Sequence, residues 1–186
     1  MDTTTKRTPQ RMRTKDMAYI AMFSALIAIC AWISVPAAVP FTMQTFGVFA
    51  AVGILGGRRG TLSILVYILL GAVGLPVFSG FRGGPGVLLG TTGGYIAGFL
   101  CSALLLWALE RFWRDRMWLL LLAMFLGMAV CYLFGTFWYM LVYSSSTGPV
   151  GILTVLARCV FPFLVPDALK ISLAAALSHR LRKSIS

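Results

Sequence analysis

Long apolar runs make up most of the chain, and short polar or Pro/Gly-rich breaks separate them. Runs of this length with few charges are typical of transmembrane helices. We therefore predict six spans, at about 17–35, 41–55, 61–75, 87–109, 117–143 and 162–178. The second and third have only about 15 residues, or ~22 Å as helix against a hydrocarbon core of ~30 Å. We expect these two to be extended by their flanks or to pack around a cavity.

The composition agrees with this pattern, because 59% of the 186 residues are hydrophobic and only 11% are charged. Soluble domains carry about 25% charged residues. The predicted fold class is an all-α integral membrane protein with a basic tail, 1–16, and a single transmembrane domain, 17–183. The first apolar run is too long for the core of a signal peptide, so we interpret it as the first span.

The positions of the basic residues predict the orientation of these spans. Six spans place both termini on one side, and 13 of the 16 Lys and Arg residues then fall on that side. Five lie in the tail, two in "GGRRG", three in "ERFWRDR" and three in "HRLRK". By the positive-inside rule both termini are cytoplasmic, and the loops 36–40, 76–85 and 144–149 face outward. Because these cations interrupt apolar runs instead of forming a polar stripe, we expect no nucleic acid partner.

Four charged residues do not fit this topology, namely Arg82, Arg158, Asp167 and Lys170. A charge at the centre of a membrane helix costs about 2.5–3.5 kcal/mol on insertion scales, so such residues are functional candidates by default. Arg82 belongs to an outward loop. For Arg158, anchoring at the outer membrane surface and contact with a ligand are both open.

Asp167 and Lys170 lie three residues apart in "FPFLVPDALK". On one helix face they can pair with each other, or each can bind a polar ligand. Pro162 and Pro166 argue against an uninterrupted helix here, so we predict that a helix restarts at Pro166. The pair would then lie in the first turn, in the outer half of the membrane.

The segment from Phe78 to Gly98, "FSGFRGGPGVLLGTTGGYIAG", is rich in glycine. It contains neither GxxxxGK[ST] nor GxGxxG, so we do not expect this chain to hydrolyse ATP. Four glycines recur every four residues, at 86, 90, 94 and 98. Where this part is helical they favour close approach of a second helix or of a ligand. Upstream, we predict that the loop with Phe81 and Arg82 forms a lid over an outward-facing pocket.

Small residues also recur at four-residue spacing in the first span, as Ala21 with Ala25 and Ser24 with Ala28. Faces of this kind let helices approach closely. Two interpretations stay open: a contact inside the bundle and a docking face for a separate subunit.

Catalysis finds little support in the sequence. The four cysteines form no CxxC pair and the chain has one histidine, His179, so neither a metal site nor a disulfide framework is predicted. No Ser-His-Asp set, Cys-His set or pair of carboxylates can be assembled in the outer half. We expect a binding and transport protein without a cofactor. A stand-alone ion-coupled carrier is an alternative, since a single intramembrane Asp can relay protons.

Three blocks of the sequence together resemble one known family. They are "VPFTMQTFGV" (39–48), "GLPVFSGFRGGPGVLLGTTGGYIAGF" (74–99) and "FPFLVPDALK" (161–170). In this order and spacing they resemble BioY, the biotin-specific S component of energy-coupling factor (ECF) transporters. The resemblance extends over about 17–183. One difference is Thr91, where the family usually has proline.

The resemblance implies a multi-pass protein of a prokaryotic cell membrane that captures biotin outside and delivers it inward. Its implied partners are a transmembrane T component and two cytoplasmic ATPases, which alone would hydrolyse ATP. Ala21 and Ala25 would then contact the T component. An S component for another vitamin is the nearest alternative.

The resemblance also implies a set of ligand-binding residues. Asp167 is expected at a ureido N–H of biotin, and Lys170 at either the ureido oxygen or the carboxylate. Arg82 is the better candidate for the carboxylate, because a guanidinium binds carboxylates in bidentate fashion. Further polar groups in the matching blocks are Gln44, Thr42, Ser79 and Tyr95, and the aromatic residues expected to cover the apolar rings are Phe41, Phe78 and Phe81.

Overall fold

The structure is a computed structural model that describes residues 13–36, 39–113, 116–147 and 151–185. Most of the predicted basic tail lies outside the described residues. So do parts of three predicted loops, at 37–38, 114–115 and 148–149.

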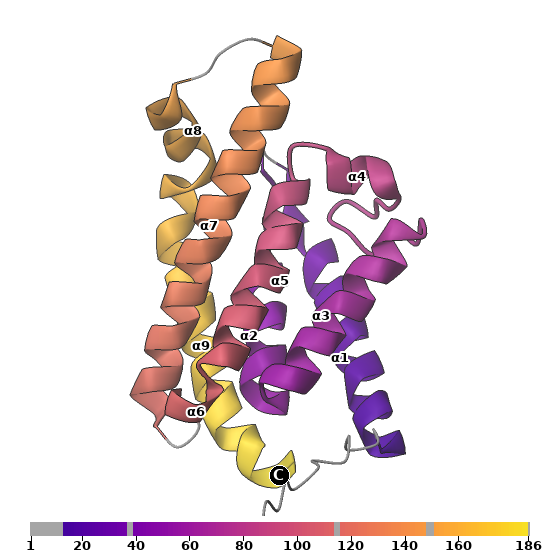
Figure 1. The fold of residues 1–186 in the computed structure, drawn as a ribbon, viewed down its shortest axis with the longest axis vertical. Helices are drawn as coiled ribbons and strands as arrows, with labels where there is room; N and C mark the ends of the chain where they lie inside the picture. The colour runs from indigo at the N-terminus through magenta and orange to yellow at the C-terminus, as the bar shows by residue number, and fades with distance from the viewer. Residues whose placement is uncertain (1–12, 37–38, 114–115, 148–150, 186) are drawn as a thin grey trace, which may run out of the picture.

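The fold is a bundle of helices that run between two ends of an elongated molecule (Figure 1). The helices of the bundle are α1 (Thr14–Trp32), α2 (Gln44–Leu55), α3 (Gly57–Ala72), α5 (Gly93–Ala108), α7 (Met117–Thr147) and α9 (Phe161–Ile185). Short helices lie at its ends: α4 (Pro85–Leu89) and α8 (Ile152–Cys159) at one, α6 (Glu110–Trp113) at the other. Within the described residues, the structure is mostly helical, as predicted, and it also has a two-residue antiparallel ribbon, β1 (Ser34–Val35) with β2 (Phe41–Thr42).

Three of the described helices, α1, α7 and α9, are long and apolar enough to cross a membrane, and α2 and α5 are shorter apolar helices. Helix α2 forms the centre of the bundle and packs against α1, α3, α5 and α9. All of its residues except Phe46 are buried. Helix α2 has only 12 residues, and its first two, Gln44 and Thr45, line a cavity.

Helices α5 and α7 pack closely where α5 carries glycine. A Cβ at Gly98 would lie 3.1 Å from the Cα of Cys131, and a Cβ at Gly94 would overlap the side chain of Trp138. These two glycines therefore allow a neighbouring helix to approach. Gly86 lies outside α5, and a Cβ there would meet nothing within 4 Å.

The predicted single helix over 87–109 is wrong, because the chain breaks between α4 and α5. The Gly90 carbonyl accepts hydrogen bonds from the Gly93 amide at 3.1 Å and from Trp138 Nε1 at 3.0 Å. The chain then folds back so closely that a Cβ at Gly93 would overlap the Leu88 carbonyl. The break turns α4 across the end of the bundle, next to the cavity.

The loop predicted at "GGRRG" is also shorter than expected, because α3 begins at Gly57 and includes Arg58 and Arg59. Gly56, with φ of 85°, makes the turn from α2. Glu110 then caps the new helix, since its carboxylate accepts a hydrogen bond from the Gly57 amide at 3.1 Å. An acid that is 53 residues away in sequence thus replaces a local cap.

The predicted helix restart at Pro166 is wrong, because α9 begins at Phe161 and runs through that residue. Pro162 lies in the first turn, where backbone N–H groups have no partner in the helix. Pro166 removes only the hydrogen bond to the carbonyl of Pro162. Asp167 and Lys170 therefore lie beyond the first turn of a continuous helix.

The small residues of α1 divide between two environments. Ser24 and Ala28 are buried, and Ser24 Oγ donates to the Ser63 carbonyl of α3 at 2.8 Å. Ala21 and Ala25 are exposed. The first pair is a contact inside the bundle, and the second leaves an open surface on α1.

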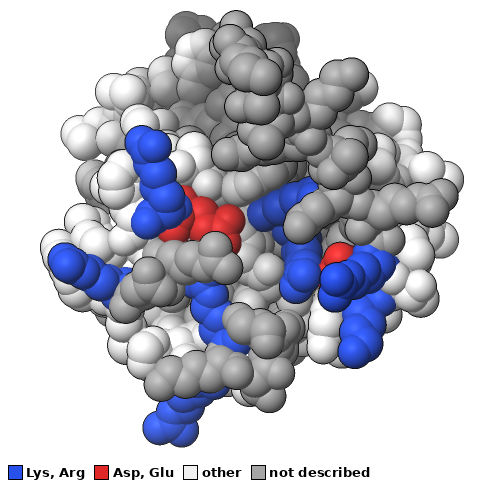
Figure 2. All heavy atoms as spheres, turned by 60° about the horizontal axis from the view of Figure 1, so that its bottom comes forward, with Lys and Arg blue, Asp and Glu red and all other residues white. Residues whose placement is uncertain are grey.

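Most of the described Lys and Arg residues gather at one end of the bundle, where α1, α3 and α7 begin, α9 ends and α6 lies (Figure 2). They are Arg13, Lys15, Arg58, Arg59, Arg111, Arg116, Arg180 and Arg182. The two described acids of this end are paired, Asp16 with Arg59 at 2.9 Å and Glu110 with Arg182 at 3.5 Å. We call this surface the basic end.

Candidate ligand-binding site

A cavity lies in the half of the bundle opposite to the basic end, among β2, the first turn of α2, the segment after α3, and helices α5, α7, α8 and α9. It contains about 680 Å³ of space that protein atoms do not fill, part of which is open to solvent. Its wall is largely apolar, with Val39, Phe78, Val87, Ile96, Phe99, Met128 and Phe163. A few polar side chains interrupt this wall, which is the usual design of a small-molecule site.

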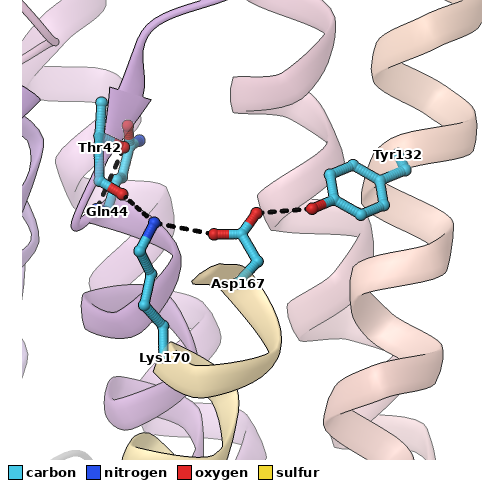
Figure 3. A network of polar contacts seen from close by, with 5 residues as sticks. All are labelled: Thr42, Gln44, Tyr132, Asp167 and Lys170. Carbon is cyan, nitrogen blue, oxygen red and sulfur yellow. Dashed lines mark hydrogen bonds and ion pairs between the residues drawn. The ribbon is translucent and has the colours of Figure 1, made fainter. Parts of the chain in front are cut away.

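Asp167 and Lys170 form an ion pair at this cavity, with 2.9 Å between Lys170 Nζ and Asp167 Oδ1 (Figure 3). Their side chains are only 7% and 8% exposed. Lys170 Nζ also donates to the Thr42 carbonyl at 2.7 Å and lies 3.7 Å from the centre of the Phe41 ring. The two residues thus pair with each other and line the cavity as well.

Tyr132 is a third member of this network that the sequence analysis missed. Its hydroxyl donates to Asp167 Oδ2 at 2.6 Å, from α7 across to α9 (Figure 3). In the sequence Tyr132 is one of several aromatic residues in a long apolar run. Only the packing of α7 against α9 gives it a polar partner, so no local signal marks it.

Thr42, in β2, and Gln44, the first residue of α2, lie on the other side of Lys170. The Gln44 side chain donates from Nε2 to the Tyr67 hydroxyl at 3.1 Å. The Gln44 backbone N–H donates to Thr42 Oγ1 at 3.2 Å. Gln44 is 5% exposed. Both side chains are therefore held at the cavity wall by contacts that need no ligand.

Arg82 lines the cavity from the end of a tight hairpin that begins at Phe78. The Phe78 amide donates to the Arg82 carbonyl at 2.9 Å. The two residues between Ser79 and Arg82, Gly80 and Phe81, have φ of 69° and 56°, the sign that a type I′ turn needs at both central positions. Arg82 Nε donates to the Ser79 carbonyl at 3.3 Å. Among the described residues, no carboxylate lies within 4.0 Å of its guanidinium.

Phe81 has a positive φ, which is unusual for a residue other than glycine, and its ring packs against Trp32. Its ring stacks on Trp32 with 5.1 Å between centroids, and the residue is 64% exposed. The structure therefore places Phe81 outside the cavity, contrary to the expected role over the ligand rings. Phe78 does face the cavity, 2% exposed and seated on Gly71, where a Cβ would overlap its ring.

The structure brings most of the predicted site residues together. Those that line the cavity are Thr42, Gln44, Phe78, Ser79, Arg82, Tyr95, Asp167 and Lys170. Phe41 lies under Lys170, and Phe81 lies outside. Arg158 is exposed on α8 and does not line the cavity. Lining residues that the sequence analysis did not name include Thr92, Met128, Cys131, Tyr132, Cys159 and Phe163.

The polar groups of the cavity favour a particular kind of ligand. Asp167 and Lys170 together are neutral, and they offer an acceptor and a donor close to each other. Arg82 offers a separate positive charge. A ligand with a neutral polar head, an apolar body and an anionic tail matches this arrangement. Among the described residues there is no group of three side chains that can hold a metal ion.

Comparison with known proteins gives a consistent result. The BioY family model matches residues 3–186. A protein from Thermotoga maritima named biotin transporter BioY is 38% identical over 170 residues, covering 91% of this chain and 96% of that protein. A probable biotin transporter BioY from Pyrococcus horikoshii is 37% identical, covering 92% of this chain and 98% of the relative.

A solved structure has the same fold. It is the crystal structure of the S-component for biotin from an ECF-type ABC transporter, with a TM-score of 0.81 and 27% sequence identity. The match covers 93% of this chain and 95% of that one. Together with the apolar helices, these relatives identify the chain as a membrane protein.

Proposed function

The chain belongs to the BioY family, and from this premise we propose that it binds biotin at the outer face of a membrane and takes part in biotin uptake. Biotin has a ureido ring with two N–H donors and one carbonyl acceptor, an apolar ring with sulfur, and a tail that ends in a carboxylate. These three parts correspond to the three kinds of group around the cavity.

The observation that carries this proposal is the buried Asp167–Lys170 pair in a largely apolar wall. We assign Asp167 to a ureido N–H and Lys170 to the ureido oxygen. The pair is already neutral, so a neutral ureido group adds donors and acceptors without adding charge. A carboxylate in the same place would leave an excess negative charge in a site with little water, which is costly.

Arg82 is the proposed partner of the biotin carboxylate. It has a bond to a backbone carbonyl and, in the described chain, no acid within 4.0 Å, so its remaining N–H groups are available. It is also exposed, as suits a tail that points toward the opening. A guanidinium can hold such a carboxylate with two parallel hydrogen bonds.

Other lining residues complete the proposed site. Thr42, Gln44, Ser79 and Tyr95 provide polar groups around the ring system. Phe78 contacts the apolar rings, while Phe41 supports Lys170 from below. Burial of these rings would provide much of the binding free energy, at about 25 cal/mol per Å² of apolar surface.

The proposed topology has six spans, α1, α2, α3, α5, α7 and α9, in the cell membrane of a prokaryote. The clustering of basic residues at one end supports a cytoplasmic basic end, with both termini there and the cavity toward the outside (Figure 2). The chain would act without catalysis of its own.

For transport we propose that the chain works with an ECF module, made of a T component and two cytoplasmic ATPases. The exposed Ala21 and Ala25 of α1 support a docking face for the T component, because small residues let a partner helix approach closely. Substituting Ala25 by Leu would weaken co-purification of the partners while biotin binding to the isolated chain persists.

A competition experiment tests the proposed ligand. The protein is purified in detergent, and binding of radiolabelled biotin is measured against unlabelled biotin, thiamine and riboflavin. We expect biotin alone to displace the label. Displacement by another vitamin at lower concentration would reassign the ligand. Uptake in cells that lack every partner ATPase, if it collapses with the ion gradient, would favour a stand-alone carrier.

A further inference from the structure

We propose that Tyr132 is a positioning residue that determines how selectively the site recognises the N–H donor of its ligand. The inference rests on the proposed function, because it concerns the same Asp167 carboxylate. It adds a residue from α7 that no sequence motif indicates.

The geometry around Asp167 carries the proposal (Figure 3). Its two carboxylate oxygens point to different partners, Oδ1 to Lys170 Nζ at 2.9 Å and Oδ2 to the Tyr132 hydroxyl at 2.6 Å. Lys170 lies one turn further along the same helix, whereas Tyr132 belongs to α7. Contacts on two sides fix the plane of the carboxylate, and Lys170 alone leaves it free to turn about the bond to Cβ.

The direction of the hydrogen bond follows from the chemistry of the two groups. An ionised carboxylate only accepts hydrogen bonds, so the phenol must be the donor. Each carboxylate oxygen can accept about two hydrogen bonds, and each has one donor among the residues that the structure describes. One acceptor position therefore remains on each oxygen for a ligand N–H. Tyr132 leaves that position open and orients it.

The orientation of the Asp167 carboxylate affects the rejection of other ligands as well as the binding of an N–H donor. A carboxylate that is fixed in position interacts unfavourably with a ligand that presents an oxygen or a methyl group in place of N–H. A buried polar group left without its partner is what gives such sites their selectivity. When the Tyr132 hydroxyl is lost, the carboxylate can turn toward Lys170, and both the affinity for N–H donors and the discrimination against other ligands decrease.

A double-mutant cycle tests this role, with Tyr132→Phe, Asp167→Asn and the double variant. Biotin affinity is measured by equilibrium binding to purified protein, and folding by thermal unfolding in the same detergent. We expect Tyr132→Phe to weaken binding about ten- to a hundred-fold, as for other hydrogen bonds to charged groups. If Tyr132 acts through Asp167, the double variant binds no more weakly than Asp167→Asn alone.

The matched control is Tyr139→Phe, the same change two turns along α7. Tyr139 is 6% exposed and stacks on Tyr143 with 5.5 Å between centroids, but it does not line the cavity. We expect Tyr139→Phe to bind biotin within about two-fold of the wild type, as is usual for changes away from a site.

A second readout separates positioning from general damage to the fold. The ratio of affinities for biotin and for an N-methylated biotin, which lacks one ureido N–H, should fall in Tyr132→Phe and stay constant in Tyr139→Phe. Unchanged biotin affinity in Tyr132→Phe, or losses that multiply in the double variant, would overturn the role of Tyr132. A wild-type protein that binds no biotin would overturn the proposed function and this role together.

Discussion

Asp167 and Lys170 form an ion pair with side chains that are 7% and 8% exposed, whereas Asp16 and Arg59, at the same distance of 2.9 Å, are 17% and 38% exposed. The second pair belongs to the basic end, where charges can reach water or lipid headgroups. A pair of that kind contributes about 0–1 kcal/mol to stability. The first pair had to lose its water, which costs several kcal/mol per ion before any attraction is gained.

The difference shows why the same two residue types need different explanations. The charges of the basic end are explained by topology, and their pairing is incidental. A buried pair is weak evidence for stability, because apolar side chains of similar volume often serve as well. Its further contacts, to Tyr132, Thr42 and Phe41, hold it at a cavity wall. Ligand binding is the role that we propose for this pair, in contrast to those of the basic end.

The largest expected effect comes from removing one member of the buried pair. Lys170→Met leaves the Asp167 carboxylate without its counter-charge, so we expect a loss of about 3–5 kcal/mol of stability and no measurable biotin binding. The double variant Asp167→Leu/Lys170→Met should regain most of that stability and still bind no biotin. Thermal unfolding in detergent and a binding assay check both.

Two outcomes with these variants would contradict the distinction between the buried pair and the pair at the basic end. A Lys170→Met protein as stable as the wild type would show that Asp167 is hydrated like Asp16. Biotin binding by the double variant would mean that the pair is structural and that the ligand lies elsewhere.

An intermediate effect is expected at Arg82, the exposed cation of the cavity. Arg82→Ala should weaken biotin binding about ten- to a hundred-fold, because a hydrogen-bonded contact between charges is lost. The affinity for biotin amide, which has no carboxylate, should hardly change. Competition binding with both ligands measures this difference.

Arg158→Ala is the matched control, because Arg158 is also exposed in the same half of the molecule but does not line the cavity. We expect its affinities to equal those of the wild type. An equal loss for biotin and biotin amide in Arg82→Ala would contradict the assignment of Arg82 to the carboxylate.

The smallest effect is expected at the basic end. Asp16→Asn breaks the pair with Arg59, and we expect a loss of about 0–1 kcal/mol in stability, reduced further at high salt. Biotin affinity should not change. Unfolding curves at low and high salt check this. A loss as large as that of Lys170→Met would remove the distinction between the two pairs.

The sequence predicted a substantial part of this site for a simple reason. Asp167, Lys170 and Arg82 violate a strong topological rule, and such violations can be counted without a structure. The order of the long helices also followed from hydropathy. The close packing at Gly94 and Gly98 followed from their spacing.

The remainder depends on contacts between distant segments. Tyr132 gains its polar partner from α9, and Glu110 caps α3 although it lies 53 residues further along the chain. The effect of Pro166 was overestimated, since one missing hydrogen bond near a helix start is tolerated when the helix is packed. Phe81 was expected over the ligand because of its position in the chain, but Trp32 provides its partner.

The most direct test of the central claim is native mass spectrometry of the protein purified from cells grown with biotin, released gently from its detergent. The account predicts a bound species with the added mass of biotin. That species should be absent from the Asp167→Leu/Lys170→Met variant. Protein that carries no ligand even after incubation with excess biotin, or that retains biotin equally in the double variant, would contradict the account.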